Sequence, residues 1–244
     1  MTVGPLAFLP WDSAHFGMRI GRATTRQLDN EAWRKLEEAC QELNLDCLYF
    51  LAAAADHVTI AALLESGFAF VDIRLTFEAR VDEVPSVRKQ EGLLFRAGSA
   101  YDLEALRPIA AGSYRRSRFY VDPRFSDERA SLMYQIWLEK SLTAGFADHV
   151  VVAESSGRAV GFITIHLDKP SGEGNIGLVG VAEAARGKGC ASGMLRHASQ
   201  WLAARGRDCL NVVTQGSNVS AQRLYQRCGF VTRSVELWFH KWFD

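Results

Sequence analysis

The chain has 244 residues, enough to bury one large hydrophobic core or two modest ones. Its 28 basic residues balance 28 acidic ones, and with 48% hydrophobic and 23% charged residues the composition is ordinary for a soluble globular protein. This balance gives no reason to expect a nucleic-acid or membrane partner, and no run approaches the about 20 apolar residues that span a bilayer. We therefore expect a cytoplasmic protein.

The cysteines and histidines do not form a metal-binding pattern. The five cysteines are scattered among apolar residues, which favours reduced core thiols: Cys40, Cys47, Cys190, Cys209 and Cys228. The six histidines show no His-x-x-x-His pairing, so we expect no metal. The N-terminal segment lacks basic residues and is too short for a signal peptide.

The first half of the chain is less regular than the second. We expect a strand at residues 48–51, a helix at 57–66 and a second strand at 71–77. The helix ends in Glu-Ser-Gly-Phe, which echoes Arg-Cys-Gly-Phe at residues 227–230. The polar segment 81–92 is typical of a linker. We therefore expect one unit at residues 1–85 and another at 92–244.

The second half starts with a strand expected at residues 93–97. Two helices follow, one from residue 102 and one at 127–142, and then a hairpin with strands at 150–154 and 159–166. Asp102 opens the first helix, and Pro108 should kink or end it. Ser126 caps the second helix. The hairpin turn reads Ser-Ser-Gly-Arg, which suits a tight connection.

A loop of small residues follows an apolar strand expected at 175–182. Residues 186–191 read Arg-Gly-Lys-Gly-Cys-Ala and lead into a helix near Ser192. Such a loop leaves main-chain N–H groups unpaired at a helix N-terminus, where the helix dipole favours a phosphate or pyrophosphate. Gly187 and Gly189 have no Cβ and let a ligand approach the backbone. By itself, the loop is equally consistent with an ordinary turn.

Two other phosphate-binding loops are excluded. A Walker loop needs Ser or Thr after Gly-Lys, but Lys188 is followed by Gly189. A dinucleotide-binding fingerprint needs a third glycine where this chain has Ser192.

A second motif follows the β-branched strand expected at residues 209–214. It has the spacing Asn-x-x-Ala-x-x-x-Tyr-x-x-x-Gly-Phe and runs from Asn218 through Tyr225. Asn218 can cap a helix, and Gly229 can end it in a left-handed conformation. Without the first motif, Tyr225 would be interpreted as an aromatic residue packing on the helix. An aromatic-rich strand at 235–243 is expected to end the sheet.

Together and in this order, the two motifs resemble the GNAT family of N-acetyltransferases, which hold acetyl-coenzyme A (acetyl-CoA) on a loop like residues 186–191. The resemblance implies an α/β fold with a central mixed, mostly antiparallel twisted sheet flanked by helices. It places the acetyltransferase domain at residues 92–244. Residues 1–85 then look like a truncated, degenerate copy of the same unit. Because no pyrophosphate loop precedes its helix, we do not expect this copy to bind coenzyme A.

The resemblance also implies roles for individual residues. The pyrophosphate loop, residues 186–191, would bind the coenzyme mainly through main-chain N–H groups of Arg186, Gly187, Lys188, Gly189, Cys190 and Ala191. The main chain of the strand before it would stabilise the oxyanion, with Gly180 suited to a bulge, through Val179, Gly180 and Val181. Asn218 would face the pantetheine arm, and Tyr225 would protonate the leaving thiolate as general acid.

Three short segments, at residues 11–17, 117–119 and 214–218, resemble members of this family that acetylate nucleotide-linked amino sugars. The acceptor would then contact Ser117, Arg118 and Phe119. Arg118 would bind the diphosphate bidentately, and Phe119 would pack on the sugar or base. Asp72 would remove the amine proton, directly or through water. The alternative for Asp72 is a surface carboxylate on a strand edge.

Two other functions stay open at this point. The chain could acetylate a different amine, such as a peptide N-terminus, a lysine, a polyamine or an aminoglycoside, although the neutral net charge disfavours cationic acceptors. It could also be a catalytically silent module that binds acyl-CoA. The sequence leaves a homodimer open as well.

Overall fold

The computed structural model describes residues 2–85, 92–168 and 170–243. Within them, eleven strands form one sheet in the order β1-β2-β3-β4-β11-β5-β10-β9-β8-β7-β6. The strands are β1 Thr2–Val3, β2 Leu6–Phe8, β3 Ile20–Ala23, β4 Cys47–Ala53, β5 Ala69–Arg80, β6 Leu94–Ala97, β7 His149–Ser155, β8 Arg158–Leu167, β9 Gly174–Val181, β10 Cys209–Gln215 and β11 Val231–Trp242. The helices are α1 Pro10–Phe16, α2 Asn30–Glu42, α3 His57–Glu65, α4 Leu103–Ser113, α5 Arg118–Val121, α6 Asp127–Thr143, α7 Cys190–Ala203 and α8 Val219–Arg227, with 3-10 turns at Ala100–Asp102 and Glu183–Ala185.

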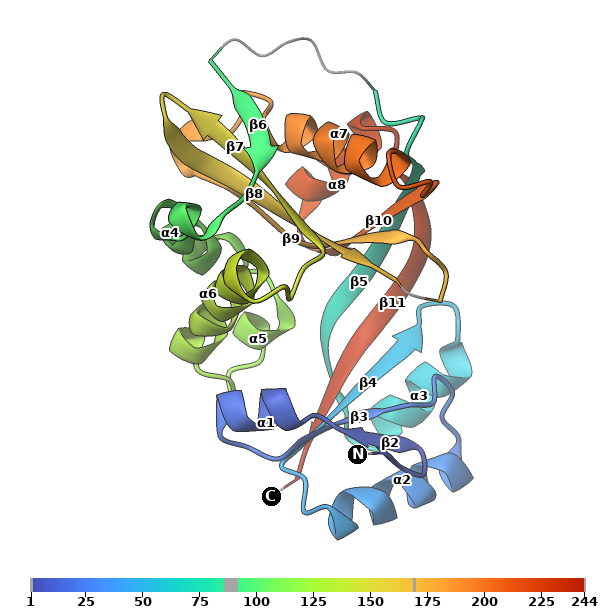
Figure 1. Cartoon of the computed structure of the whole chain (residues 1–244). Helices are drawn as coiled ribbons and strands as arrows, with labels where there is room; N and C mark the ends of the chain where they lie inside the picture. Colours follow the sequence, from blue (N-terminus) through green and yellow to red (C-terminus); the bar gives the residue numbers. More distant parts are fainter. Residues whose placement is uncertain (1, 86–91, 169, 244) are drawn as a thin grey trace.

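Two long strands connect the halves of the sheet. Strand β5 belongs to the first half of the chain but pairs with β10, and β11 ends the second half but pairs with β4 (Figure 1). The two strands also pair with each other, antiparallel, in the middle of the sheet. Each half therefore places its last strand beside the other half. The expectation that the final strand ends the sheet is wrong, since β11 is an interior strand.

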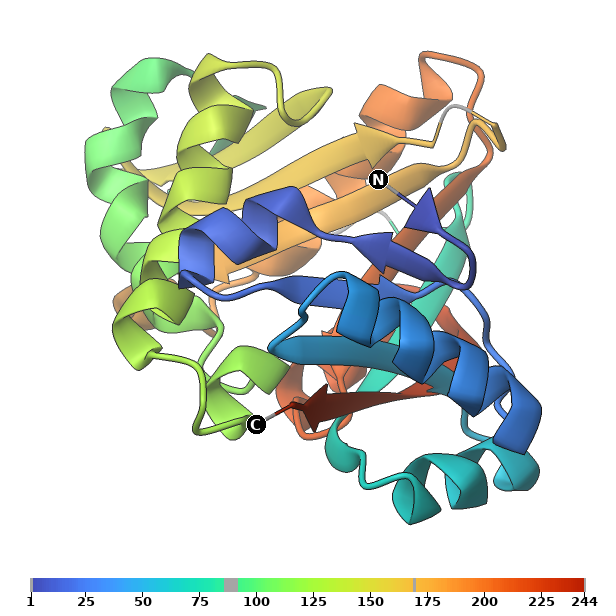
Figure 2. The same cartoon turned by 90° about the horizontal axis from the view of Figure 1, so that it is seen from below.

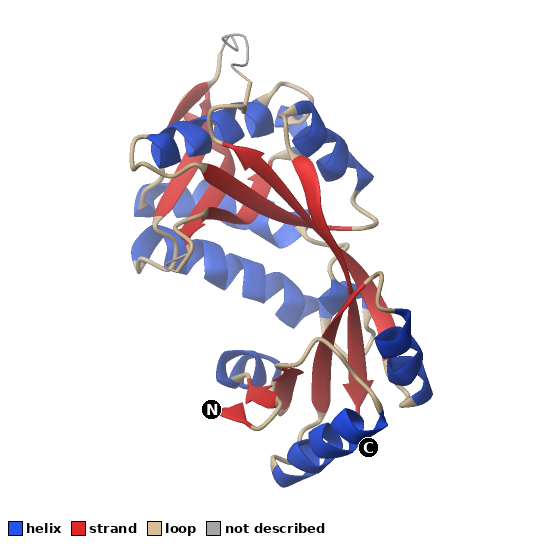
Figure 3. Ribbon diagram, turned by 90° about the vertical axis from the view of Figure 1, so that its right-hand side faces the viewer, coloured by secondary structure: helices blue, strands red, loops and turns tan. Residues whose placement is uncertain are grey.

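Helices cover both faces of the twisted sheet (Figures 2 and 3). Helices α7 and α8 bury one hydrophobic cluster, which includes Phe77 and Val212, against the second half of the sheet. Helices α2 and α3 cover the first half with a separate cluster around Phe50. On the opposite face, α1, α4, α5 and α6 enclose a third cluster that includes Tyr49 and Phe162. Successive side chains of a strand point to opposite faces of the sheet, so each central strand contributes side chains to the helix layers on both faces.

The predicted fold class is confirmed. Among the strand pairs of the described residues only β3–β4 and β9–β10 are parallel, so the sheet is mixed and mostly antiparallel. Ser126 caps α6 as expected, its side chain accepting from the Arg129 amide at 3.4 Å. The hairpin turn has two residues with positive φ, Ser156 and Gly157, as a tight hairpin connection requires.

Pro108 does not end helix α4, which continues to Ser113. That part of the expectation is wrong because the rest of the helix is held by packing, with Leu106 and Ala110 buried beneath it. The predicted linker lies in part outside the described residues, which stop at residue 85 and resume at 92.

The resemblance between the two halves extends to matching hydrogen bonds. Helix α3 starts after Asp56 and α8 after Asn218, and each cap side chain accepts from the amide three residues on. Gly67 and Gly229 lie eleven residues after these caps, with φ of +77° and +84°. The next amide bonds the carbonyl of Leu63 in one copy and of Tyr225 in the other, at 3.0 Å in both. Both helices then lead into a strand of 12 residues.

Candidate active site

The site begins where strands β9 and β10 separate. They pair at three positions only, the last joining Val212 to Ile176, and β9 then continues to Val181 without β10 beside it. The hydroxyl of Tyr114 donates to the Val179 carbonyl at 3.1 Å across this opening. Because the N–H and C=O of a strand residue point to the same side, the amide of Val179 faces the opening too, as does that of Val181 two residues on.

Gly180 faces the other way, towards Phe162 on β8, its register partner. Its lack of a side chain serves packing, since a Cβ at Gly180 would lie 2.6 Å from the Phe162 ring. The predicted bulge is wrong in its position. The register shifts opposite Thr164 instead, at Gly177 and Leu178.

Local contacts explain that position. The extra residue leaves the Leu178 amide without a strand partner, and the Thr164 hydroxyl accepts its hydrogen bond at 2.9 Å. A Cβ at Gly177 would lie 2.5 Å from the His166 ring, so only glycine fits. The bulge lies at the start of the part of β9 that runs free of β10.

The pyrophosphate loop lies at the N-terminus of α7 with Arg186, Gly187 and Lys188 exposed. Gly187 and Gly189 have φ of +75° and +84°, a conformation that disfavours other residues. Among the described residues, the amides of Gly187, Lys188 and Gly189 make no main-chain hydrogen bond, and Gly189 gives α7 no side-chain cap. Together with the first amides of the helix, they present a set of N–H donors to an anion.

The end of the loop is fixed in the core. The Cys190 side chain is buried, and its Sγ contacts the Ala185 carbonyl at 3.4 Å. Only the main chain of Cys190 and Ala191 therefore faces a ligand at the helix N-terminus. The loop therefore offers main-chain N–H groups at this end of α7, and its binding of a diphosphate through them stays a prediction.

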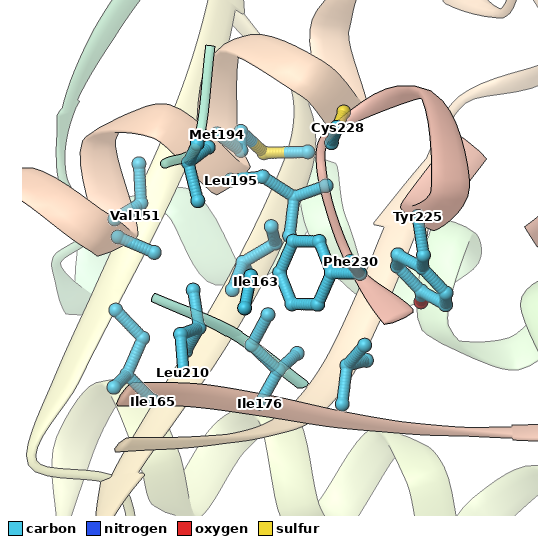
Figure 4. Close-up of a cluster of buried hydrophobic side chains, with 14 of the residues drawn as sticks. Val151, Ile163, Ile165, Ile176, Met194, Leu195, Leu210, Tyr225, Cys228 and Phe230 are labelled. Atoms are coloured by element: carbon cyan, nitrogen blue, oxygen red, sulfur yellow. The ribbon is translucent and has the colours of Figure 1, made fainter. Parts of the chain in front are cut away.

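Tyr225 lies on α8 at the edge of a hydrophobic cluster, beside Phe230 (Figure 4). Its ring centroid is 5.8 Å from those of Phe77 and Phe230, and 3% of the residue is exposed. Burial raises the pKa of Tyr225, so the phenol stays protonated at neutral pH and can act as a proton donor. The packing interpretation and the catalytic one are both compatible with this position.

A set of tyrosines connects the opening to helix α6. Tyr114 stacks on Tyr134 with ring centroids 4.2 Å apart. Burial raises the pKa of Tyr114, and repulsion from Tyr134 and Tyr225 raises it further, so both of these hydroxyls lie within electrostatic reach of Tyr114. Burial also raises the pKa of Tyr134 to about 12. All three therefore remain neutral hydrogen-bond donors.

Asn218 caps α8 as predicted, accepting from the Ala221 amide at 3.3 Å. The neighbouring Ser217 carbonyl accepts from Arg116 at 2.6 Å, which ties the segment before α5 to the segment before α8. This contact closes one side of the region beyond the end of β10.

Asp72 lies in that region. The amide of Gly216, just after β10, donates to the carbonyl of Ile73 at 2.7 Å. At Asp72 strand β5 pairs with β11 only, because its pairing with β10 ends at Arg74, and the residue is half-buried, so the alternative of a carboxylate on a strand edge stays open. Burial raises the pKa of Asp72 to about 6, although a main-chain hydrogen bond from Ile73 and the charge of Arg118 oppose the shift. Its role as a base stays a prediction.

Arg118 is held on several sides. Its guanidinium lies over the rings of Tyr49 and Trp238, 4.0 and 4.5 Å from their centroids. It also lies 2.9 Å from Nε2 of His240, whose Nδ1 lies 2.7 Å from Asp122. Burial lowers the pKa of His240 to about 4, so the ring is neutral, donates through Nδ1 to Asp122 and accepts from Arg118.

The other two predicted acceptor residues are buried. Ser117 is 4% exposed, and Phe119 is 5% exposed between Phe16 and Phe125, with ring centroids 5.3 and 5.4 Å away. The Phe119 ring therefore packs beneath the Arg118 guanidinium from within the core, and its own exposed surface is too small to contact a sugar.

Several site residues were missed from the sequence: Asp12, Tyr114, Asp122, Tyr134 and His240. Only Asp12 had a signal, since it lies in the short segment 11–17. Burial raises the pKa of Asp12, and the charge of Arg118 counteracts this, which places Asp12 near the same guanidinium. The others lie on elements far apart in sequence.

Residues 109–230, half of the chain, match the model of the Acetyltransferase (GNAT) family. The chain therefore belongs to this family, and it is an enzyme of the acetyltransferase class. Members of the family use acetyl-CoA, which fits the N–H donors of the pyrophosphate loop.

The chain is similar to two curated relatives and one solved structure within this family. The chain is 24% identical over 241 residues to a dTDP-fucosamine acetyltransferase of Escherichia coli, covering 96% of both. It is 32% identical over 193 residues to a mycothiol acetyltransferase of Mycolicibacterium paratuberculosis, covering 73% of this chain and 58% of the relative. A GCN5-related N-acetyltransferase from Sphaerobacter thermophilus, 18% identical, has the same fold with a TM-score of 0.70, over 97% of this chain and 76% of that one.

Within the part of the chain that the structure describes, no three His, Cys, Asp or Glu side chains are grouped so that they could hold a metal ion. No described helix combines the length and the apolar character needed to cross a membrane.

Proposed function

We propose that the chain transfers the acetyl group of acetyl-CoA to the amine of a nucleotide-linked amino sugar. The observation that carries the proposal is the position of Asp72, a half-buried carboxyl with a pKa near 6 just beyond the end of β10. Asp72 lies within electrostatic reach of Tyr134, which stacks on Tyr114, and the Tyr114 hydroxyl donates to the Val179 carbonyl at the opening. The relative of similar length, whose name specifies dTDP-fucosamine, supports this acceptor class.

The proposed chemistry uses main-chain and side-chain donors in turn. The amides of Val179 and Val181 would donate to the thioester oxygen as it gains negative charge during amine attack. Tyr225 would give its proton to the leaving thiolate. Asn218, with its side-chain oxygen engaged as a cap, would offer its amide nitrogen to the pantetheine arm.

Asp72 would take the proton that the amine must lose. With a pKa near 6, the carboxyl is ionised at neutral pH yet basic enough to accept a proton, directly or through water. Arg118 lies within electrostatic reach of Asp72 and is already fixed by aromatic rings and His240. We therefore propose that Arg118, with Ser117 and Phe119 behind it, shapes the acceptor side near the amine.

We also propose that residues 1–85 complete the acceptor side of residues 92–244 rather than bind a second coenzyme. Asp72 comes from the first half and Tyr225 from the second, so neither half would carry both catalytic groups. A homodimer is not required by this arrangement.

An acceptor of another kind is the second candidate. The mycothiol acetyltransferase has the higher identity over a shorter alignment, and its name specifies mycothiol rather than a nucleotide-linked sugar. A silent acyl-CoA-binding module is the third candidate, and it would release no coenzyme A with any amine.

The test is an acetylation screen with mass detection. Purified protein and acetyl-CoA are incubated with dTDP- and UDP-linked amino sugars, with their free amino sugars, and with peptides, lysine and polyamines. We expect a mass gain of one acetyl group on a nucleotide-linked amino sugar. Acetylation of the free amines alone would favour the second candidate, and no coenzyme A release with any of them would favour the silent module.

A further inference from the structure

A polar strip lies on one face of the central strands, next to Asp72. Residues opposite each other on neighbouring antiparallel strands point to the same face. Trp238 is opposite Asp72, and Glu236 is opposite Arg74. The face that carries Asp72 and contacts Arg118 through Trp238 therefore continues to Arg74 and Glu236.

Glu236 binds two arginines there. Its carboxylate forms ion pairs with Nη1 of Arg26 through one oxygen and with Nη1 of Arg74 through the other. The Glu236 side chain is 4% exposed, whereas those of Arg26 and Arg74 are 67% and 28% exposed. We call these three residues the arginine pair site.

The charge of the arginine pair site is positive. One carboxylate meets two guanidinium groups, each with five N–H donors in a planar fork. Burial requires Glu236 to be paired, so it fixes both arginines while leaving donors on their solvent side. Two oriented forks next to each other suit a ligand with two adjacent anionic groups.

The arginine pair site borders open surface. A depression beside Arg26 is lined by the segment before α2 and by the end of β4 with the loop after it, through Thr25, Arg26, Gln27, Ala53, Ala55 and Asp56. Gln215 is opposite Arg74 on β10 and adds an amide on the other side. A nucleoside attached to an anion at the arginine pair site would have room at the depression.

The spacing along the strand matches the acceptor of the proposed function. Two residues of a strand advance about 7 Å, so Arg74 lies about that far from Asp72 on the same face. A pyranose ring separates a 4-amino group from the phosphate on its anomeric oxygen. An amine placed at Asp72 would therefore direct the diphosphate of a nucleotide sugar towards Arg74 and Arg26.

We infer that Arg26 and Arg74, held by Glu236, form the subsite for the diphosphate of a nucleotide-linked acceptor. The inference rests on the proposed acceptor class and moves the diphosphate contact away from Arg118, whose guanidinium is held by Tyr49, Trp238 and His240. Glu236 is a positioning residue in this arrangement.

The probe is dTDP, titrated calorimetrically into the full chain saturated with coenzyme A so that the pyrophosphate loop is occupied. Wild-type protein should bind dTDP under these conditions. Arg26→Ala and Arg74→Ala should each weaken dTDP about tenfold, as expected when a charge-assisted hydrogen bond is lost. Arg34→Ala, on the exposed side of α2, is the matched control and should bind like wild type.

Removing one arginine leaves Glu236 with a single partner, so Arg26→Lys and Arg74→Lys are included. They keep the ion pair and the charge but lose the planar fork, and we expect a smaller loss of dTDP affinity with an unchanged melting temperature. In kinetics with a nucleotide-linked acceptor, the arginine variants should raise the acceptor KM and leave the KM of acetyl-CoA unchanged.

Unchanged dTDP affinity in the Arg26→Ala, Arg74→Ala double variant would overturn the inference, as would wild-type binding that disappears when coenzyme A is present. These outcomes differ from failure of the proposed function. If dTDP binds and depends on both arginines but no nucleotide-linked amino sugar is acetylated, the subsite stands and the proposed reaction fails. If such a sugar is acetylated with unaltered KM in the double variant, the reaction stands and the subsite is wrong.

Discussion

Helices α2 and α7 occupy equivalent places in the two halves, each connecting a pair of parallel strands, β3–β4 and β9–β10. Their N-termini differ. The carboxylate of Asp29 caps α2 and accepts from the Ala32 amide at 2.8 Å, whereas Gly189 gives α7 no side-chain cap. In the first helix the Asp29 carboxylate occupies one of the first amides and places a negative charge where an anion would bind. The second has no such side chain, and under the proposed function its first amides serve the coenzyme.

The same contrast recurs at the following helices. Leu63 of α3 stands in the place of Tyr225 of α8, counted from the caps Asp56 and Asn218. Under the proposed function, the second half supplies the loop and the hydroxyl that serve the coenzyme, whereas the first half has neither at the equivalent positions. Asp72, on the strand after α3, has Ser234 at its counterpart position after α8. The comparison suggests that the two copies contribute different catalytic groups, which the following variants test.

Tyr225→Phe should have the largest effect. The change removes the hydroxyl that is the proposed proton donor. Position 225 of α8 then lacks a hydroxyl, like its counterpart Leu63 in α3. Positioned acid–base groups contribute about 10²- to 10⁴-fold, so we expect kcat to fall by that range with little change in the KM of acetyl-CoA. Steady-state kinetics decide this, and wild-type kcat would show that water or another group protonates the thiolate.

Asp72→Asn should have the second largest effect. The wild-type kcat/KM should rise with pH through about 6, as the Asp72 carboxyl loses its proton, and this dependence should vanish in the variant. At neutral pH we expect a loss of about 10²-fold, at the low end for a positioned base. A pH profile of both proteins measures it, with Ser234→Ala as the control from the other copy. A variant profile that still rises near pH 6 would place the base elsewhere.

The same substitution should stabilise the protein above pH 6. The folded-state pKa of Asp72 is raised, so the neutral form favours folding below the unfolded pKa, and this contribution is lost as the pH rises through about 6. Asparagine carries no charge at any pH. The melting temperature of Asp72→Asn should therefore exceed that of wild type at pH 8 and approach it at pH 4. A melting temperature of Asp72→Asn below that of wild type at pH 8 would show that the ionised Asp72 carboxylate does not destabilise the folded protein.

Gly189→Asp tests the contrast between the helix N-termini directly, because it places at α7 a negative charge like that of Asp29 at α2. Asp and Asn both tolerate the left-handed conformation of residue 189 better than most residues, so Gly189→Asn is the neutral control. A charge near a helix N-terminus contributes up to about 2 kcal/mol, so the aspartate should weaken coenzyme A roughly tenfold more than the asparagine.

Calorimetric titration with coenzyme A measures these affinities, and Lys188→Ala should change them far less than Gly189→Asp. Equal affinities of the aspartate and asparagine variants would contradict binding by helix amides.

Asp29→Ala should have the smallest effect. Loss of a helix cap costs about 1 kcal/mol of unfolding free energy, and we expect that loss with unchanged kinetics, because the proposed function assigns no ligand to α2. Asn218→Ala should lose a similar amount and also raise the KM of acetyl-CoA. Urea unfolding and steady-state kinetics of the two variants compare the copies. A raised KM in Asp29→Ala would show that the first half contributes to coenzyme binding.

Local signals determined much of the fold and the coenzyme side of the site. The cap at Asn218, the left-handed Gly229 and the glycines of residues 186–191 depend on backbone conformations set within a few residues, so their spacing carries the information. For the same reason the hairpin around Gly157 and the caps of the helices were predictable from the sequence.

Tertiary structure decided the rest. That β5 and β11 exchange places, that the bulge falls opposite Thr164 rather than at Gly180, and that Arg118 is held by Tyr49, Trp238 and His240 follow from pairing and packing between segments far apart in the chain. No local pattern encodes such contacts, because each depends on which distant strand supplies the hydrogen bonds and which side chains fill the space beside it.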